Sequence, residues 1–267
     1  MRSDILEVLV MARDLFPGVG LVTNGTLFAN FSQNKLHQLH ELAKAITIQV
    51  SIDSIDSKQN NVVRGQTMQV LDGLDILERN QIPFSVGIVL TKVNVPCLSE
   101  TLNFLISKYV YLKGFNLMNV MPELGKWKEY LALRVPLEHY FAVIDEIKKL
   151  KEELRRPDIY IPPSEVPSLE VMFDQSGFRT CVAGLFKMHV MPDGSVNPCD
   201  LIRQVIFGNL YTDSWRDIYS RFLSWFFSLQ EKAKGPQCLY FNRGKDRHLT
   251  GQLIPSLESS RISGISC

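Results

Sequence analysis

The stretch from residue 46 to residue 53 alternates strictly between apolar and polar side chains, and this alternation limits the possible folds more than any other feature. Successive side chains of a strand point to opposite faces, so one face would carry Ile46, Ile48, Val50 and Ile52, and the other Thr47, Gln49, Ser51 and Asp53. A strand covered by helices on both faces should be apolar throughout. We therefore expect helices on the apolar face only, with the polar face lining a wet or ligand-holding interior. An edge strand with one solvated face is the alternative.

Strand-like and helix-like segments alternate along the first 155 residues. The patterns predict strands at 20–22, 46–53, 84–90 and 115–120, and helices at 1–16, 32–44, 67–80, 98–112 and 137–155. Repeated strand-then-helix units predict a parallel sheet with right-handed crossovers. The order suits a doubly wound α/β sheet or part of a (β/α) barrel.

The character of the chain changes after residue 157, where four prolines fall within eleven residues. Residues 186–197 are typical of a β-hairpin that turns through Pro192-Asp193-Gly194, and a helix is expected at 214–229. We therefore predict two domains: an α/β domain at 1–157 and a small α+β domain at 158–267.

Charge and hydropathy exclude some classes of partner and location. Lys and Arg number 29 and Asp and Glu 28, a balance that argues against nucleic acid or an anionic membrane as the main partner. No apolar run is long enough to span a bilayer, and Asp4 and Glu7 interrupt any signal-peptide core. A cytoplasmic protein is expected, whose cysteines are thiols or metal ligands rather than disulfides.

Three cysteines lie in the second predicted domain. Cys181 and Cys199 flank the hairpin as C-x12-G-x4-C, with Gly194 at the turn, and Cys238 follows. A tight hairpin brings its two ends together, and paired thiolates suit zinc or an iron–sulfur cluster. Buried thiols that act as small apolar side chains are the alternative.

Seven short motifs occur in a characteristic order. They are TNGT (23–26), SID (51–53), VVRG (62–65), TKVN (91–94), CVAG (181–184), MPDGSVNPC (191–199) and FGNL (207–210). In this order the chain resembles, over about residues 1–238, the radical S-adenosylmethionine enzymes that carry a C-terminal auxiliary-cluster domain of the SPASM or twitch type.

The resemblance implies a fold and a cofactor site. The family fold is a partial (β/α)6 barrel, of which this chain would hold about four parallel strands, followed by a small α+β SPASM-like or twitch-like domain with a β-hairpin. By resemblance, Thr23, Asn24, Ser51 and Asp53 would line the S-adenosylmethionine pocket, Arg64 would pair with its methionine carboxylate, and Asn94 would close the loop after the third strand. As alternatives, TNG is a turn, Arg64 a surface residue and Asn94 a helix cap.

The chain also departs from the family. It has no C-x3-C-x2-C motif for the catalytic 4Fe–4S cluster and no Gly-Gly-Glu-type segment, so it is expected to be an N-terminally truncated or degenerate member whose strand near Leu21 forms an open edge. Cys181, Cys199 and Cys238 would give an auxiliary 4Fe–4S cluster three ligands, with Cys267 or an outside group as the fourth. Cys97 is expected to be structural.

Relatives of this kind modify peptides or small cofactor and antibiotic precursors by 5′-deoxyadenosyl radical chemistry. Because the cluster motif is absent, we assign no catalytic residue and expect this chain to be inactive alone. One alternative is a non-catalytic subunit. Such a subunit would bind a peptide, or would pair through its open barrel edge with a complementing chain that supplies the missing strands. Another is a structural zinc protein with the same three cysteines.

Overall fold

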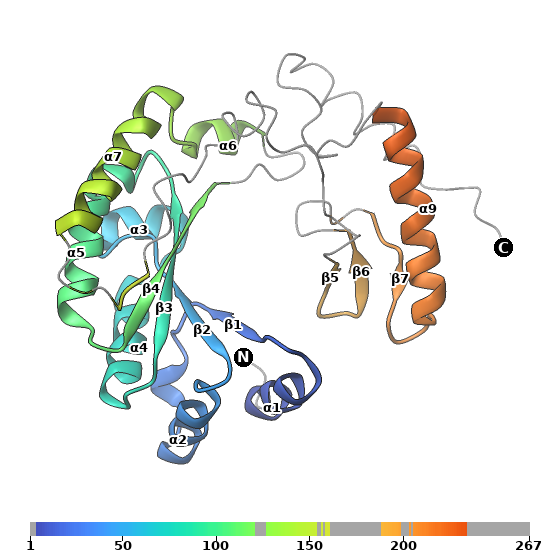
Figure 1. Cartoon of the computed structure of the whole chain (residues 1–267), viewed down its shortest axis with the longest axis horizontal. Helices are drawn as coiled ribbons and strands as arrows, with labels where there is room; N and C mark the ends of the chain where they lie inside the picture. The colour runs from blue at the N-terminus through green and yellow to red at the C-terminus, as the bar shows by residue number, and fades with distance from the viewer. Residues whose placement is uncertain are drawn as a thin grey trace. The chain divides into compact units, whose positions relative to one another are not determined.

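The computed structural model describes residues 4–120, 127–153, 156, 158–160, 188–198, 203 and 205–233 (Figure 1). The chain divides into two compact units: Met1–Val120 with Ala132–Val166, and Met121–Leu131 with Pro167–Cys267. The predicted boundary at residue 157 stays a prediction. In the described part of the chain, no helix is both long enough and apolar enough to cross a bilayer.

The first unit is built on a parallel sheet of four strands. They are β1 (Gly20–Thr23), β2 (Thr47–Ser51), β3 (Phe84–Leu90) and β4 (Leu112–Asn119), paired in the order β1-β2-β3-β4. The arrangement confirms the predicted partial barrel of about four parallel strands. Since β2 lies between β1 and β3, the edge-strand interpretation of 46–53 is wrong; β1 is the edge strand instead.

Helices connect the strands and cover one face of this sheet, as the ribbon of α4, α5 and α7 shows (Figure 1). The helices of the first unit are α1 (Ile5–Leu15), α2 (Gln33–Leu42), α3 (Ser57–Val63), α4 (Thr67–Arg79), α5 (Leu98–Lys108) and α7 (Leu137–Glu153), with 3-10 turns η1 (Phe28–Asn30) and η2 (Val95–Cys97). A further short helix, α6 (Trp127–Leu133), falls in the second unit as far as Leu131. The sequence did not predict α3 or α6. Each has only seven residues, too few for a helical period to stand out.

The core lies between the helices and the apolar face of the sheet. Ile48, Val50 and Ile52 of the alternating segment are buried there, as predicted. Helical spacing predicts an inner stripe of Leu36, Leu39, Leu42 and Ala43 for α2, and all four are buried. For α4 it predicts Met68, Leu71, Leu74 and Leu77, but Met68 is 63% exposed. Leu74 and Leu77 of the predicted stripe are buried, and Val70, four residues before Leu74, is buried with them.

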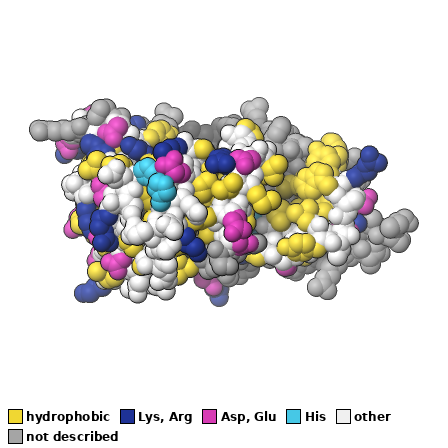
Figure 2. All heavy atoms as spheres, turned by 90° about the horizontal axis from the view of Figure 1, so that it is seen from below, with side chains coloured by type: hydrophobic (Ala, Val, Ile, Leu, Met, Phe, Trp, Pro, Cys, Tyr) yellow, Lys and Arg dark blue, Asp and Glu magenta, His cyan; other side chains and the backbone are white. Residues whose placement is uncertain are grey.

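Helix α1 buries only part of the inner stripe that helical spacing predicts, which is Ile5, Val8, Leu9, Ala12, Leu15 and Phe16. Leu6 and Leu9 are buried, while Val8, Leu15 and Phe16 of the predicted inner stripe are exposed. Helix α1 contacts α2. In the view from below, hydrophobic side chains gather around the region of α1 (Figure 2).

The second unit contains the predicted hairpin. Strands β5 (His189–Val190) and β6 (Ser195–Asn197) are antiparallel, and a third strand, β7 (Gly208–Asn209), pairs with β6. The turn is closed by Gly194, whose φ of +83° suits glycine. The Asp193 carboxylate accepts hydrogen bonds from the backbone N–H and the hydroxyl of Ser195.

Helix α9 (Trp215–Ala233) supplies the apolar core of this unit. Ile218 and Phe222 are fully buried, and the Phe207 ring packs edge-on against Phe222 and Trp225 with centroids 5.1 and 5.3 Å apart. Arg221 of α9 donates a hydrogen bond to the Phe207 carbonyl. The helix predicted at 214–229 is thus confirmed.

Candidate functional site

The polar face of the sheet becomes more buried toward the carboxyl end of β2. Thr47 is exposed and Gln49 half-buried, while Ser51 and Asp53 are buried. The side-chain oxygen Oε1 of Gln49 accepts a hydrogen bond of 3.0 Å from Nδ2 of Asn116 on β4. Gly87 of β3 lies between them, and a side chain there would collide with Gln49. The inner face is therefore polar, as the alternation predicts.

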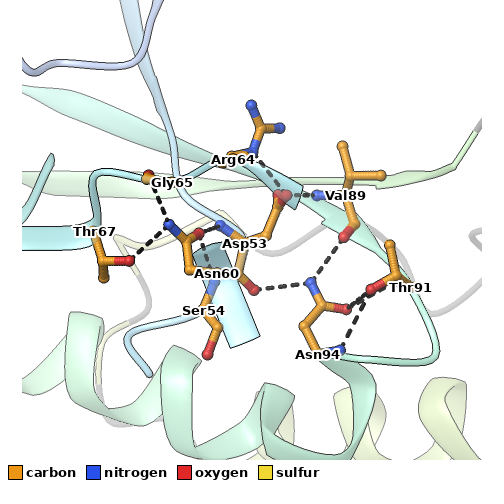
Figure 3. A network of polar contacts seen from close by, with 9 residues as sticks. All are labelled: Asp53, Ser54, Asn60, Arg64, Gly65, Thr67, Val89, Thr91 and Asn94. Atoms are coloured by element: carbon orange, nitrogen blue, oxygen red, sulfur yellow. Dashed lines mark hydrogen bonds and ion pairs between the residues drawn. The ribbon is translucent and has the colours of Figure 1, made fainter. Parts of the chain in front are cut away.

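Asp53 and Arg64 form an ion pair at this end of the sheet (Figure 3). Arg64 Nε lies 2.8 Å from Asp53 Oδ2, and the Asp53 side chain is only 2% exposed. The other oxygen, Oδ1, accepts the Val89 N–H of β3 at 2.9 Å. Among the described residues, Oδ2 accepts no hydrogen bond. The two terminal nitrogens of Arg64 point away from Asp53 in Figure 3, so, among the described residues, they are available to another anion.

Asn94 links the ends of β2 and β3. Its Nδ2 donates to the carbonyl oxygens of Asp53 and Val89, both at 2.8 Å, and its Oδ1 accepts the N–H of Thr91 at 2.8 Å. Although η2 starts directly after Asn94, the side chain makes no capping bond to it. The helix-cap interpretation of Asn94 is therefore wrong.

Thr23 and Asn24 lie at the end of the neighbouring strand β1. The Thr23 hydroxyl accepts the N–H of Gly25, and Asn24 Oδ1 accepts the N–H and hydroxyl of Thr26, which makes TNGT a hydrogen-bonded turn. The register partner of Thr23 in the sheet is Val50, whose side chain lies on the apolar face of β2. In the described contacts, no hydrogen bond joins this turn to Asp53.

The structure thus brings three predicted residues, Asp53, Arg64 and Asn94, into direct contact and places Ser51 on the same face as Asp53.

The predicted metal ligands Cys181, Cys199 and Cys238 lie outside the described residues, as does Cys267. Within the part that is described, no three His, Cys, Asp or Glu side chains are grouped as metal ligands. The thiol of Cys97, expected to be structural, accepts a hydrogen bond of 2.9 Å from the side-chain amide of Gln59.

Sequence reasoning missed two members of the network, Asn60 and Thr67. Asn60 is fully buried, and its Oδ1 accepts the backbone N–H of Asp53 at 2.8 Å. The only signal for it is its position four residues before Arg64, which places both on one side of a helix. Its polar neighbours in the sequence hide that signal.

Comparison with known proteins finds similarity over most of the chain. Residues 181–240 match the SPASM family, described as an iron–sulfur cluster-binding domain. The uncharacterized protein MJ0907 of Methanocaldococcus jannaschii is 31% identical over 145 residues, which cover 52% of this chain and 44% of that protein. The AdoMet-dependent heme synthase of Methanosarcina barkeri is 22% identical over 233 residues, covering 82% of this chain and 64% of the relative. The matches therefore span less than two thirds of either relative.

Solved structures share the fold. Streptococcus suis SuiB bound to S-adenosylmethionine aligns with a TM-score of 0.59 at 17% identity, over 81% of this chain and 51% of SuiB. SuiB bound to its precursor peptide SuiA gives 0.60 at 16% identity, with the same coverage. Native anSMEcpe with bound AdoMet and a peptide gives 0.56 at 17% identity, over 90% of this chain and 70% of that protein. At these identities the likeness is one of fold.

Proposed function

We propose that the chain is a radical S-adenosylmethionine protein with a SPASM-type iron–sulfur domain, and that the carboxyl end of β2 and β3 binds S-adenosylmethionine, with Arg64 holding its methionine carboxylate. The observation that carries the proposal is the Arg64–Asp53 ion pair of 2.8 Å. Asp53 engages Nε only, so the planar guanidinium keeps its terminal nitrogens for a bidentate contact with a carboxylate.

The residues around this pair fit the cofactor. Asp53 Oδ2 is a buried acceptor without a hydrogen bond from the described residues, and it can accept one from a ligand hydroxyl or amine. Ser51 lies two residues earlier on the same polar face. Thr23 and Asn24 end the adjacent strand and would border the same pocket. This chain contributes binding and orientation, while the radical chemistry belongs to the cofactor and a catalytic cluster.

The auxiliary cluster is assigned to the second unit. Cys181, Cys199 and Cys238 all fall within residues 181–240, and we propose them as its ligands. The β5–β6 hairpin lies between the first two in sequence. Because the 267 residues contain no C-x3-C-x2-C motif, we propose that this chain alone does not cleave S-adenosylmethionine.

A peptide is the proposed substrate class. SuiB has been solved with its precursor peptide SuiA, and anSMEcpe with a bound peptide. Small cofactor or antibiotic precursors are the other class that the resemblance implies. The polar inner face at Gln49 and Asn116 suits amide groups, which both donate and accept hydrogen bonds.

A second polypeptide is proposed to complete the site at the edge of β1. Val22 of this strand is 65% exposed, and Val8, Met11 and Leu15 form an exposed apolar stripe on α1. An open edge in a parallel sheet favours addition of another strand. The proposed partner therefore supplies a parallel strand together with the C-x3-C-x2-C ligands.

Binding measurements with three ligands test the role of Arg64. Calorimetry should show that Arg64→Ala weakens binding of S-adenosylmethionine and of S-adenosylhomocysteine by about tenfold or more, since a hydrogen bond to a charged group contributes about 1.5–3 kcal/mol. Binding of 5′-methylthioadenosine, which lacks the amino-acid carboxylate, should not change. Arg79→Ala is the matched control, because Arg79 is an exposed arginine of α4 that bonds only locally to the Asp75 carbonyl. Equal losses for all three ligands, or none, would overturn the assignment.

A tagged chain tests the proposed partner. We expect it to purify with a polypeptide that contains C-x3-C-x2-C, and the complex, but not the chain alone, to form 5′-deoxyadenosine after anaerobic reconstitution. Val22→Lys should abolish the complex and leave S-adenosylmethionine binding intact, because it places a charge at the open edge. Turnover by the chain alone would contradict this proposal.

A further inference from the structure

The side chain of Asn60 touches both ends of the segment that carries the Asp53–Arg64 pair (Figure 3). At one end its Oδ1 accepts the N–H groups of Asp53 at 2.8 Å and Ser54 at 3.3 Å. At the other end its Nδ2 donates to the carbonyl oxygen of Gly65 at 3.2 Å and to the hydroxyl of Thr67 at 2.9 Å. A single buried amide group thereby contacts both the start and the end of the segment 53–67, which includes helix α3.

The backbone after α3 needs such a contact. Gly65 and Gln66 both have positive φ, +75° and +56°, and a left-handed conformation costs a residue other than glycine about 1–2 kcal/mol. The contact from Asn60 Nδ2 to the Gly65 carbonyl oxygen lies directly at this bend. The Asn60 carbonyl oxygen also accepts the N–H groups of Arg64 at 2.8 Å and Gly65 at 3.3 Å. The same residue therefore holds the bend through its backbone and through its side chain.

Arg64 is the residue immediately before this bend. Its ion-pair partner, Asp53, is fixed at its own N–H by Asn60 and at its carbonyl oxygen by Asn94. Moving Gly65 relative to Asp53 would change the 2.8 Å separation of Arg64 Nε and Asp53 Oδ2, because no other side chain drawn in Figure 3 contacts both Asp53 and the 65–67 bend. The guanidinium orientation therefore depends on Asn60.

We propose that Asn60 is a positioning residue, which holds Arg64 on Asp53 so that the terminal guanidinium nitrogens face a ligand carboxylate. The ligand part of this inference rests on the proposed function, whereas the positioning of Arg64 does not. The Thr67 hydroxyl accepts a hydrogen bond from Asn60 Nδ2 and donates one of 2.9 Å to Oδ1 of Asn61. Thr67 therefore helps to hold the Asn60 side chain in place.

The test uses the full chain, labelled with ¹⁵N-arginine and free of ligand. The Arg64 Nε–H signal is assigned by its loss in Arg64→Ala, and its exchange with water is measured by NMR. Asn60→Ala should speed that exchange by about tenfold, the factor that corresponds to one lost net hydrogen bond. Asn80→Ala is the matched control and should leave exchange unchanged, because Asn80 Nδ2 also donates to a backbone carbonyl, that of Ile76, but at the end of α4.

A second variant covers the case in which Asn60→Ala does not fold. Thr67→Val removes only the hydroxyl that Asn60 Nδ2 contacts and should speed Arg64 Nε–H exchange in the same direction by a smaller factor. Unchanged exchange in a folded Asn60→Ala protein, or in Thr67→Val where the first variant is unfolded, would overturn the inference.

Ligand binding separates this inference from the proposed function. If both hold, Asn60→Ala weakens S-adenosylmethionine but not 5′-methylthioadenosine, and it adds no further loss in the background of Arg64→Ala, because coupled residues are not additive. If Arg64→Ala leaves S-adenosylmethionine affinity unchanged, the proposed function fails, and the exchange measurement still decides the role of Asn60. If Arg64→Ala weakens binding and Asn60→Ala does not, the positioning role fails alone.

Discussion

The side-chain nitrogen of Asn94 lies 2.8 Å from the carbonyl oxygen of Asp53, although 41 positions separate the two residues in the sequence. The same nitrogen donates to the carbonyl oxygen of Val89, so one amide group joins the ends of β2 and β3. Asp53 carries the buried carboxylate of the candidate site. The contact therefore connects the stability of the first unit to the geometry of that site.

Replacing Asn94 should destabilise the first unit strongly. Asn94→Ala leaves the carbonyl oxygens of Asp53 and Val89 and the N–H of Thr91 without this partner in a buried region. A buried polar group without a partner costs about 1–3 kcal/mol, so we expect the free energy of unfolding to fall by about 2–4 kcal/mol in urea titrations. Asn24→Ala, which removes an exposed turn contact, should cost less than about 1 kcal/mol. Equal losses for the two variants would contradict this account.

Gly73 of α4 should not tolerate alanine. Alanine normally stabilises a helix by about 1 kcal/mol relative to glycine. Here, however, a Cβ would collide with the carbonyl oxygen of Gly25 in the TNGT turn, and a backbone atom cannot rotate away. We expect a net loss of about 1–3 kcal/mol in thermal or urea unfolding. Gly18→Ala is the control, since its Cβ would meet nothing within 4 Å, and a stabilised Gly73→Ala protein would refute the close approach.

The stability of the second unit should depend on the charge of Asp213. The N–H of Asn209 and the guanidinium of Arg221 hold the pKa of Asp213 below its ordinary value of about 3.9. A pKa that folding lowers contributes stability above the unfolded pKa, and the contribution disappears as the pH falls through the folded pKa. Asp213→Asn should therefore lower the melting temperature at neutral pH, and its difference from the unmodified chain should shrink below about pH 4.

Tryptophan fluorescence can follow that transition, because all three tryptophans, Trp127, Trp215 and Trp225, belong to the second unit. A difference between the two proteins that persists or grows at the lowest pH reached would show that the Asp213 charge is not its source.

Metal analysis should distinguish an iron–sulfur cluster from zinc. After anaerobic reconstitution we expect iron together with acid-labile sulfide, and we expect Cys181→Ser, Cys199→Ser or Cys238→Ser to lower both, because thiolates are the cluster ligands. Cys97→Ser should leave the iron content unchanged, since its thiol bonds to Gln59 in the first unit. Zinc without sulfide would instead identify a structural zinc site.

Local patterns predicted much of the fold. The apolar residues of 46–53 and the leucines of α2 are buried as their spacing indicates, and the limits of β3 coincide with the expected 84–90. The hairpin at Gly194 follows from its turn residues. In contrast, Val8, Leu15 and Phe16 of the stripe predicted for α1 are exposed, because an apolar residue on a helix is buried only where a neighbour covers it.

The sequence by itself determined most of the longer strands and helices and which face of β2 is polar, because side-chain periodicity is a local property of the chain. Only the tertiary structure decided that Asp53 pairs with Arg64 and that the Asn94 side chain bonds to the end of β2 instead of capping η2. It also decided that Asn60 connects Asp53 to the bend at Gly65. These contacts join residues from different elements, and their geometry depends on how the strands align in the sheet. The pattern of neighbouring residues in the sequence does not predict that alignment.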